Sequence, residues 1–541
     1  MKALIAYLSD YRDRNDYFLS LMPVGALSIA ASLEARGHEI VLANYSKEGV
    51  RSAAAHIQSL KPEAVGLSVY THNRTDSFRL AAEIRKRLPK TLIVAGGPHA
   101  AFLGEEILRR VKAIDYVVRG EGELALADLL ERGAKRAPAA DRIITGGRIN
   151  KLDALPAPSR FGGVMRGIDP NEQFKYLITS RGCPHRCVFC CSPNLWGRET
   201  AFHSAGHIAD EIEYCVKTYG IIYFSIRDDN FTLRRKRVLE FCRLLRERKL
   251  YIMWNCQSRV DTLDEEMLVE MKRAGLEHIQ LGVESGSKRV LSMYDKRTTV
   301  ADIERASAAV RRAGVYLAFY LMAGMRGERA SDIGKTVELI RRTLPGDGMV
   351  SPVALYPGTA LYDEARERGD IDDDIWFRSK ENGIYLRGEA EVGRWIQRLA
   401  NELGAIRERS WYRERDFRAH RRVVGDGCWV TDILEGDYYL DGELYDRALE
   451  RYRAAADRHP GNPWPFLRMG KARFMSESYA EAERDFASVT NIVPPYYGGW
   501  LKRAESLLAL GRREEARECA ERAGRLNPYD FRIRNIRKIL R

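Results

Sequence analysis

Three cysteines lie close together in the chain, Cys183, Cys187 and Cys190 in the segment RGCPHRCVFC. Their C-x3-C-x2-C spacing leaves three thiolates able to hold three irons of a [4Fe–4S] cluster, with the fourth iron open to an incoming ligand. A zinc site or three unrelated thiols are the alternatives. Zinc takes a fourth ligand and usually pairs of Cys or His at other spacings. We therefore expect these cysteines to hold a catalytic iron–sulfur cluster.

The composition is that of a globular protein with several domains. The 541 residues are 45% hydrophobic and 30% charged, and such a length suggests about three domains. No apolar run approaches the ~20 residues that span a bilayer, and the first apolar run, KALIAYL, is too short for a signal peptide. Four of the nine cysteines lie within 183–191 and none precedes Cys183. This distribution argues against a disulfide framework and favours one metal site in a reducing cytoplasm.

The net charge of +13 raises the question of an acidic partner such as nucleic acid. The basic residues alternate with acidic ones along helical segments and form no block. We interpret most of them as solvated helix faces, so nucleic acid is not an expected partner.

Residues 1–150 alternate short apolar runs with helical patterns, which predicts a doubly wound, Rossmann-like α/β domain with buried parallel strands. The predicted strands are 2–8, 39–44, 64–69, 91–95 and 114–118, and the predicted helices are 23–36, 50–60, 74–88, 101–110 and 122–131. Ligands of such domains bind beyond the carboxyl ends of the strands.

The loops at those strand ends are rich in glycine, which lets the backbone approach a large ligand. We expect one ligand site to be lined by Pro23, Gly25, Ser68, Tyr70, Gly96, Gly97, Pro98, Gly120, Glu121 and Gly122. One glycine-rich loop alone is weak evidence for a ligand site, whereas several such loops at the same edge of the sheet are stronger evidence.

Residues 165–390 contain six strand-like runs, most of them followed by a helical pattern. The runs are 174–180, 221–226, 251–256, 278–283, 315–322 and 349–355. Repeated strand–helix units predict a partial (β/α)6 barrel, whose chemistry lies at the carboxyl ends of the strands. The polar residues that follow those strands include Asp228, Asp229, Arg259, Glu284 and Ser285.

Residues 429–541 repeat with a period of 34, which predicts tetratricopeptide (TPR) helix hairpins in an all-α solenoid with a capping helix at 531–541. The recurring residues are Ala448, Ala482, Ala516, Pro460, Pro494 and Pro528. Such an array either binds a protein or peptide in its groove, or braces the barrel or forms a dimer contact. Because repeats contact mainly their neighbours, we expect a chain ending near Arg422 to fold. The segment 391–428 is interpreted as a helical connector.

The cysteine motif resembles that of the radical S-adenosylmethionine (SAM) superfamily, in which SAM fills the open cluster site through its amino and carboxylate groups. An aromatic residue before the last cysteine fits that pattern. The expected SAM-binding residues are Phe189, Asp228, Asp229, Arg259, Glu284 and Ser285. The glycine loops ahead of the motif resemble the cobalamin (B12)-binding domain of B12-dependent members. Both resemblances together cover most of residues 1–390.

The expected roles in SAM binding follow from charge. Asp228 or Asp229 can accept from the ammonium of SAM, Arg259 can pair with its carboxylate, and Glu284 can accept from its ribose hydroxyls. A single acid at a strand end is otherwise a common helix cap. Arg326 departs from the proline that the family commonly has in its G-x-P-G-E turn, which puts the geometry of that loop in doubt.

The D-x-H-x-x-G motif that supplies a histidine to cobalt in many cobalamin proteins is absent. The resemblance then implies cobalamin without a protein base on its lower face, with Tyr70 or His72 near that face.

The resemblance implies a cobalamin-dependent radical SAM enzyme that methylates an unactivated carbon of an unknown substrate through a 5′-deoxyadenosyl radical. It also implies a flavodoxin- or ferredoxin-like electron donor, and a second SAM that remethylates the cobalt. The alternatives are a cobalamin-associated rearrangement or cyclisation without methyl transfer, a radical SAM enzyme that has lost cobalamin and, more distantly, a non-catalytic TPR adaptor.

Overall fold

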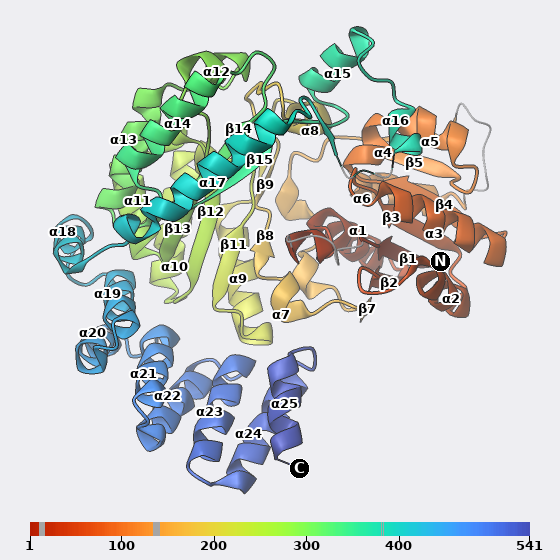
Figure 1. The fold of residues 1–541 in the computed structure, drawn as a ribbon. Coiled ribbons are helices and arrows are strands. Elements are labelled where there is room, and N and C mark those ends of the chain that lie inside the picture. The colour runs from red at the N-terminus through yellow and green to blue at the C-terminus, as the bar shows by residue number, and fades with distance from the viewer. Residues whose placement is uncertain (10–16, 134–140, 380, 382, 541) are drawn as a thin grey trace.

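The computed structural model describes residues 1–9, 17–133, 141–379, 381 and 383–540. Two α/β units lie side by side, and an all-helical arm runs beneath the second unit (Figure 1). The predicted fold class is therefore confirmed. None of the described helices is long and apolar enough to span a membrane.

The first unit is built on a parallel sheet with strand order β6-β5-β4-β3-β1-β2-β7. The strands are β1 (Lys2–Tyr7), β2 (Glu39–Asn44), β3 (Ala64–Ser68), β4 (Leu92–Gly96), β5 (Tyr116–Gly120), β6 (Ile143–Gly146) and β7 (Val164–Arg166). Successive residues of β1 enter different hydrophobic cores, Ile5 on one face and Leu4 on the other. Burial on both faces explains why these strands are continuous apolar runs.

The helices of this unit match the predicted ones closely. They are α1 (Val24–Ala35), α2 (Val50–Leu60), α3 (Arg74–Arg87), α4 (Pro98–Phe102), α5 (Gly104–Arg110) and α6 (Gly122–Glu131). The chain leaves β1 for β2 on one side and returns to β3 on the other, so the strand order reverses between β1 and β3. A ligand crevice is expected at that reversal.

Two edge strands, β6 and β7, have no counterpart among the predicted strands. Both are short, and the burial pattern of neither shows a fully buried residue. β7 pairs with β2, so the first sheet continues past residue 150, the predicted end of the first domain.

The second unit is a parallel sheet with strand order β15-β14-β13-β12-β11-β8, the partial six-stranded barrel that the sequence predicts. Its strands are β8 (Tyr176–Leu177), β11 (Tyr223–Ile226), β12 (Met253–Ser258), β13 (Leu276–Glu284), β14 (Tyr316–Ala323) and β15 (Asp347–Pro352). The helices around it are α9 (Ala205–Tyr219), α10 (Arg235–Glu247), α11 (Glu265–Arg273), α12 (Lys288–Met293), α13 (Val300–Arg312) and α14 (Ala330–Thr343).

Shorter elements connect these units. They are η1 (Tyr17–Ser20), η3 (Leu152–Ala154), η4 (Pro158–Arg160), α7 (Pro170–Gln173), β9 (Ser180–Arg181), α8 (Ser192–Trp196), β10 (Ala201–Phe202), η5 (Phe231–Leu233), η6 (Val260–Thr262), β16 (Ala354–Leu355), α15 (Ala360–Glu367), α16 (Ile375–Arg378) and β17 (Ile384–Tyr385).

The predicted strand 174–180 is divided into β8 and β9. Asp228 causes this break, because its carboxylate accepts hydrogen bonds from the backbone N–H groups of Thr179 at 2.5 Å and Ser180 at 3.1 Å. A side chain thus takes the place of a neighbouring strand.

The predicted connector 391–428 consists of α17 (Ala390–Ser410) and α18 (Glu414–Val424). In α17, Trp395, Leu399 and Leu403 belong to the same core as the barrel strands, and the helix runs along β15 (Figure 1). The first half of this segment is therefore packed as a barrel helix.

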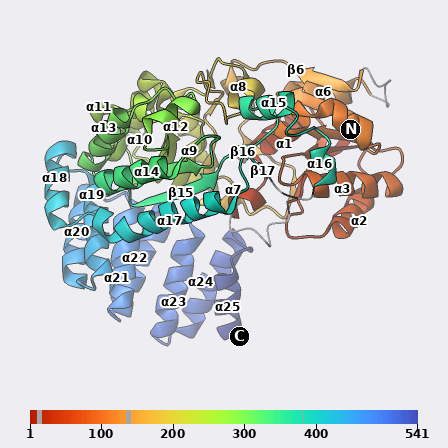
Figure 2. The ribbon, with the colours of Figure 1, turned by 45° about the horizontal axis from the view of Figure 1, so that its top comes forward.

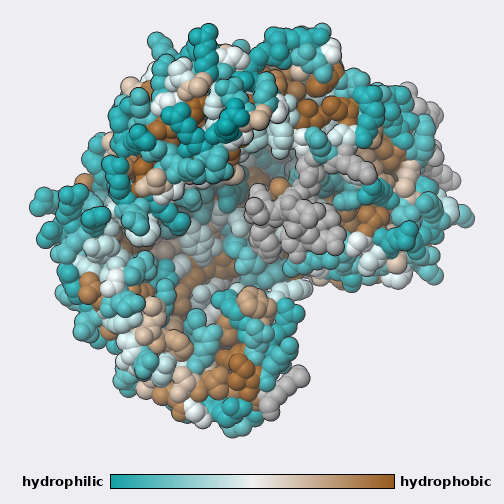
Figure 3. Space-filling view, viewed as in Figure 1, coloured by the Kyte–Doolittle hydropathy of each residue, from teal (hydrophilic) through white to brown (hydrophobic). Residues whose placement is uncertain are grey.

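The C-terminal array repeats a helix hairpin every 34 residues, as predicted. The pairs are α19 (Trp429–Asp441) with α20 (Tyr445–Arg458), α21 (Pro463–Met475) with α22 (Tyr479–Ile492), and α23 (Tyr497–Ala509) with α24 (Arg513–Leu526), followed by α25 (Phe531–Ile539). Gly470 permits the close approach of α21 and α22, because a Cβ there would lie 2.6 Å from the Phe486 ring. On the face shown in Figure 3, the surface of the array mixes hydrophilic residues with several hydrophobic patches.

The array lies against one side of the barrel in both ribbon views (Figures 1 and 2). Ile222 and Met253 of the barrel share a hydrophobic core with Trp429. At the far end of the array, Asn527 donates a hydrogen bond to Asp169 at 3.1 Å. The array therefore contacts the rest of the chain at both of its ends.

Candidate functional site

A cavity of about 180 Å³ lies at the carboxyl ends of the barrel strands, and all three motif cysteines line it. The lining residues are Cys183, His185, Cys187, Phe189, Cys190, Pro193, Asp229, Gln257, Ser258, Arg259, Gln280, Gly282, Glu284, Lys296 and Tyr320. Cys191 follows the motif directly but does not line this cavity.

The thiols suit a cluster better than a single ion. Among the described residues, the three cysteines do not form a group whose ligand atoms all lie within 4.8 Å of one another, as the ligands of one zinc ion do. Burial raises the pKa of each thiol, that of Cys190 to about 12. The thiols become ligands only as thiolates, so binding of the cluster must displace their protons.

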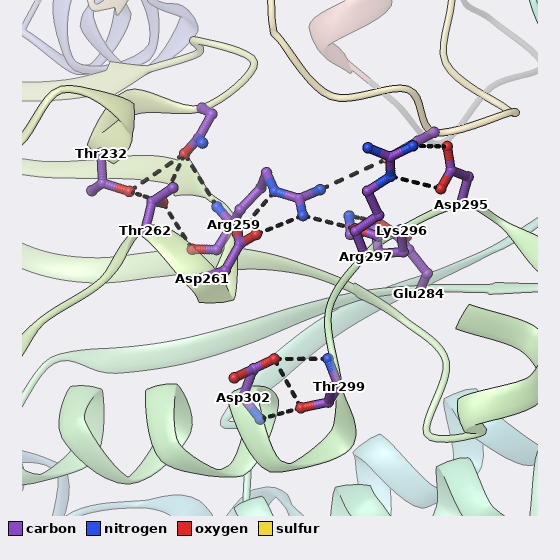
Figure 4. Close-up of polar contacts among 12 residues, drawn as sticks. Thr232, Arg259, Asp261, Thr262, Glu284, Asp295, Lys296, Arg297, Thr299 and Asp302 are labelled. Carbon is purple, nitrogen blue, oxygen red and sulfur yellow. Dashed lines mark hydrogen bonds and ion pairs between the residues drawn. The ribbon is translucent and has the colours of Figure 1, made fainter. Parts of the chain in front are cut away.

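Arg259 lies at the edge of the cluster loop, with its Nη1 atom 3.7 Å from the Sγ atom of Cys187. Its guanidinium is held by Asp261 at 2.8 Å and by the backbone carbonyl of Lys296 at 2.8 Å (Figure 4). The positive charge is therefore fixed in position beside the thiols, where a carboxylate ligand of the cluster could pair with it.

Glu284 lines the cavity at the end of β13, where the sheet register is irregular and its φ is +64°. Its carboxylate accepts a hydrogen bond from Lys296 Nζ at 2.7 Å, and both side chains are buried. Lys296 also lies over the Phe189 ring. Lys296 was not predicted as a site residue, because it follows α12 and not a strand end.

We expect Lys296→Met to destabilise the protein by about 3 kcal/mol or more, because it leaves the Glu284 carboxylate buried without its partner. Thermal unfolding measures this loss, and equilibrium dialysis measures the weaker SAM binding that should accompany it. Lys288→Met, at an exposed position of α12, is the control and should change neither quantity. An unaltered melting temperature in Lys296→Met would contradict a structural role for the pair.

The structure separates the two adjacent aspartates. Asp228 is fully buried and outside the cavity, where it binds Thr179, Ser180 and Arg237. Asp229 lines the cavity and accepts a hydrogen bond from the Ser192 hydroxyl. Burial raises the pKa of Asp229. Asp229 is therefore the aspartate that can reach a ligand.

Ser285 is also placed outside the cavity. Its side chain is buried, and its hydroxyl accepts a hydrogen bond from the backbone N–H of Ser287 and lies 3.3 Å from the Thr336 hydroxyl. Its role in the described structure is to shape the turn after β13. The cavity is also lined by three polar side chains that were not predicted as ligands, those of Gln257, Gln280 and Tyr320. Gln280 accepts a hydrogen bond from the Tyr320 hydroxyl at 2.7 Å, and Gln257 donates one to that hydroxyl at 3.1 Å.

A second cavity, of about 260 Å³, opens at the carboxyl ends of the first sheet. Of the residues predicted to line a site there, all but Pro23 do so: Gly25, Ser68, Tyr70, Gly96, Gly97, Pro98, Gly120, Glu121 and Gly122. Pro23 instead precedes α1 and accepts hydrogen bonds from the backbone N–H groups of its first turn.

The glycines of this cavity leave its walls as bare backbone. Gly97 has a φ of +95°, and a Cβ there would lie 2.8 Å from the backbone oxygen of Val69. A Cβ at Gly25 would meet no atom within 4 Å, so a side chain at Gly25 would extend into open space on the cavity wall. This arrangement fits a large planar ligand that approaches the backbone closely.

His72 does not line the second cavity, and its Nε2 atom lies 2.9 Å from the Tyr7 hydroxyl. Tyr70 does line it, and burial raises the pKa of Tyr70 to about 12. The residue near a bound ligand is therefore a neutral hydroxyl. His203 is the histidine that the described structure places on this cavity wall.

A buried charge network borders the second cavity where it meets the barrel. Arg181 donates to Glu121 and to Glu123, both at 2.6 Å, and Arg148 donates to Glu121 at 2.8 Å. The carboxylate of Glu121, a predicted ligand-binding residue, is thus already paired with Arg181 and Arg148. Arg181 was within reach of sequence reasoning, because it lies two residues before Cys183.

The two cavities meet at Asp229, which lines both. One side of this residue faces the cysteine motif, and the other faces the glycine-lined cavity of the first unit. A group transferred between the two sites would therefore pass beside Asp229.

Comparisons with known proteins match the two α/β units to two different domain families. The B12 binding domain matches residues 17–130, and the radical SAM superfamily matches residues 177–340. The chain is therefore a radical SAM enzyme that also carries a B12-binding domain. The residues around the two cavities fit the cofactors of these domains, a [4Fe–4S] cluster with SAM in one cavity and cobalamin in the other.

Two relatives and one solved structure illustrate the likeness. An uncharacterized methyltransferase of Pyrococcus horikoshii is 27% identical over 365 residues, covering 63% of this chain and 78% of the relative. An anaerobic magnesium-protoporphyrin IX monomethyl ester cyclase of Rubrivivax gelatinosus is 27% identical over 381 residues, covering 65% and 67%. The structure of the radical SAM methyltransferase TsrM of Kitasatospora setae with cobalamin and a [4Fe–4S] cluster bound aligns with a TM-score of 0.59 at 17% identity, covering 84% and 100%. At that identity the alignment shows the shared fold.

Proposed function

We propose that this chain is a cobalamin-dependent radical SAM methyltransferase that acts on an unactivated carbon. The observation that carries the proposal is the junction of the two cavities at Asp229. This junction supports the proposal, because methyl transfer requires the site for the cluster and SAM to lie next to the site for cobalamin. When bound, the cofactors supply radical formation and the methyl group.

The residues of this chain position those cofactors. Cys183, Cys187 and Cys190 would hold the cluster. We assign the SAM carboxylate to Arg259 and its ammonium to Asp229, because both charged groups line the cavity of the cysteines. The ribose hydroxyls go to Glu284, and Phe189 forms part of the wall.

The cobalamin site would be formed by the glycine loops, with the Tyr70 hydroxyl near the lower face and no histidine supplied by the D-x-H-x-x-G motif. We expect Gly25→Leu to weaken cobalamin binding about tenfold or more, because its side chain would occupy space that the ligand needs. Cobalt content after anaerobic reconstitution measures this effect.

Gly334→Leu is the matched control for that variant. Gly334 also lies within a helix, and a Cβ there also meets no atom within 4 Å, but it is not on the cavity wall. It should bind cobalamin as the parent chain does. Equal cobalt content in the Gly25→Leu variant would argue against this cavity as the cobalamin site.

The second candidate is a cobalamin-associated cyclisation or rearrangement without methyl transfer. The similarity to a cyclase supports this candidate. The two functions consume SAM differently. Methyl transfer yields S-adenosylhomocysteine as well as 5′-deoxyadenosine, whereas a cyclisation yields only the second product.

We assign the helical array to the TPR type on its 34-residue period, and we favour bracing of the barrel as its role. A peptide or protein in its groove remains the other proposal for this array, and it would bind on the face that the barrel leaves open. The electron donor would be a flavodoxin- or ferredoxin-like protein. The nine cysteines are unpaired, which supports a reducing cytoplasm.

A further inference from the structure

Asp153, His203 and His207 bring one oxygen and two nitrogen ligand atoms together at the seam between the two α/β units. Among the described residues, they form a group of three His, Cys, Asp or Glu side chains whose ligand atoms all lie within 4.8 Å of one another. Asp153 belongs to η3, between strands β6 and β7 of the first sheet. His203 lies just before α9 of the barrel, and His207 lies in the first turn of that helix. None of them takes part in the proposed reaction.

The distances suit a small divalent ion. His203 Nδ1 lies 3.0 Å and His207 Nδ1 lies 3.8 Å from the same oxygen, Asp153 Oδ1. Ligands bound at about 2.1 Å around a tetrahedral zinc ion are about 3.4 Å apart. The two carboxylate–histidine distances bracket that value. Because the two rings are stacked at an interplanar angle of 14°, they turn toward each other when both Nδ1 atoms bind one ion.

Hydrogen bonding accounts for only part of the arrangement. The Asp153 carboxylate accepts from the backbone N–H of Ser204 at 3.0 Å, which fixes its orientation as outer-shell partners fix a metal ligand. The His207 ring, at 3.8 Å, is too far from Asp153 for a hydrogen bond. It stacks on His203 with ring centroids 4.3 Å apart, so the two imidazoles lie face to face beside one carboxylate.

The position also leaves room for a solvent ligand. The Asp153 side chain is 42% exposed, while His203 and His207 are 16% and 24% exposed. Two histidines and one carboxylate with an open fourth position form a common zinc coordination set. His203 in addition lines the cavity of the first unit.

We propose that Asp153, His203 and His207 form a binding site for a divalent transition metal of the zinc class, separate from the cluster. The bound ion ties η3 of the first unit to the start of α9 in the barrel. It thereby fixes the wall of the glycine-lined cavity at His203.

The test uses the full chain with its cluster and cobalamin reconstituted and loosely bound metal removed, and the probe is zinc chloride. We expect one zinc per chain by mass spectrometry after desalting, and a rise in the melting temperature with zinc. His207→Ala should weaken zinc binding at least about tenfold and abolish the rise. Its cluster absorbance reports whether the fold is kept.

Two controls and one second variant complete the design. His38→Ala and Cys191→Ser should bind zinc as the parent chain does, which excludes these two side chains as the zinc ligands. If His207→Ala fails to fold, Asp153→Asn serves instead, because the amide oxygen still accepts from Ser204 while the charge is lost. Zinc binding that is absent in the parent chain, or equal in the parent and the variants, would overturn the proposal and leave a hydrogen-bonded cluster only.

Discussion

Replacing Cys183, Cys187 or Cys190 with alanine should remove the cluster iron and lower SAM cleavage by more than about 100-fold. Each thiol lines the same cavity, and a cluster with one missing ligand loses both affinity and its fixed position beside Arg259. Iron content and the formation of 5′-deoxyadenosine after anaerobic reconstitution measure the two effects.

Cys191→Ala is the matched control, because Cys191 follows the motif but lies outside the cavity at the start of α8. It should retain both iron and SAM cleavage. Full iron loading in the Cys187→Ala variant, or stoichiometric zinc in the parent protein in place of iron, would show that the motif does not hold this cluster.

Removing residues 423–541 should leave a barrel that is insoluble or unfolds readily. The array buries Ile222 and Met253 of the barrel, at 4% and 3% exposure. Exposing two such side chains costs about 3–6 kcal/mol, which is comparable to the whole stability of many domains. Expression in soluble form and thermal unfolding of the truncated chain measure the loss.

This expectation reverses the one drawn from the repeat pattern alone, which was that a chain ending near Arg422 folds. A chain ending at Pro528 is the control. It loses Ile533, Ile536 and Leu540, which cover the last repeat of the array, but it keeps α19 and the contacts of α19 with the barrel. Its barrel should therefore keep the cluster. A chain ending at residue 422 that is soluble and as stable as the parent would show that the array is merely attached.

Local patterns were the features that the sequence predicted well. The cysteine spacing, the glycines after the strands and the 34-residue period each depend on residues close together in the chain. Buried strands such as β1 and β3 were identifiable because both their faces are covered. The short edge strands β6 and β7 carry no such pattern and were missed.

The partners of the site residues could not be predicted in the same way. Asp228 and Asp229 are neighbours in the loop after β11, and the sequence alone does not show which side chain faces the cavity, so either was a reasonable ligand. Lys296 reaches Glu284 only through the path of the chain around α12. Likewise, the repeat pattern of the array is the same whether its surface is free or packed against the barrel.

The central claim is that this chain transfers a methyl group by using both cavities together. The most direct test incubates the reconstituted, reduced chain with SAM and candidate substrates, with and without cobalamin, and measures 5′-deoxyadenosine and S-adenosylhomocysteine. We predict that both products form with cobalamin, and that S-adenosylhomocysteine disappears without it. Formation of 5′-deoxyadenosine with a converted substrate but no S-adenosylhomocysteine would contradict methyl transfer and support a cyclisation or rearrangement.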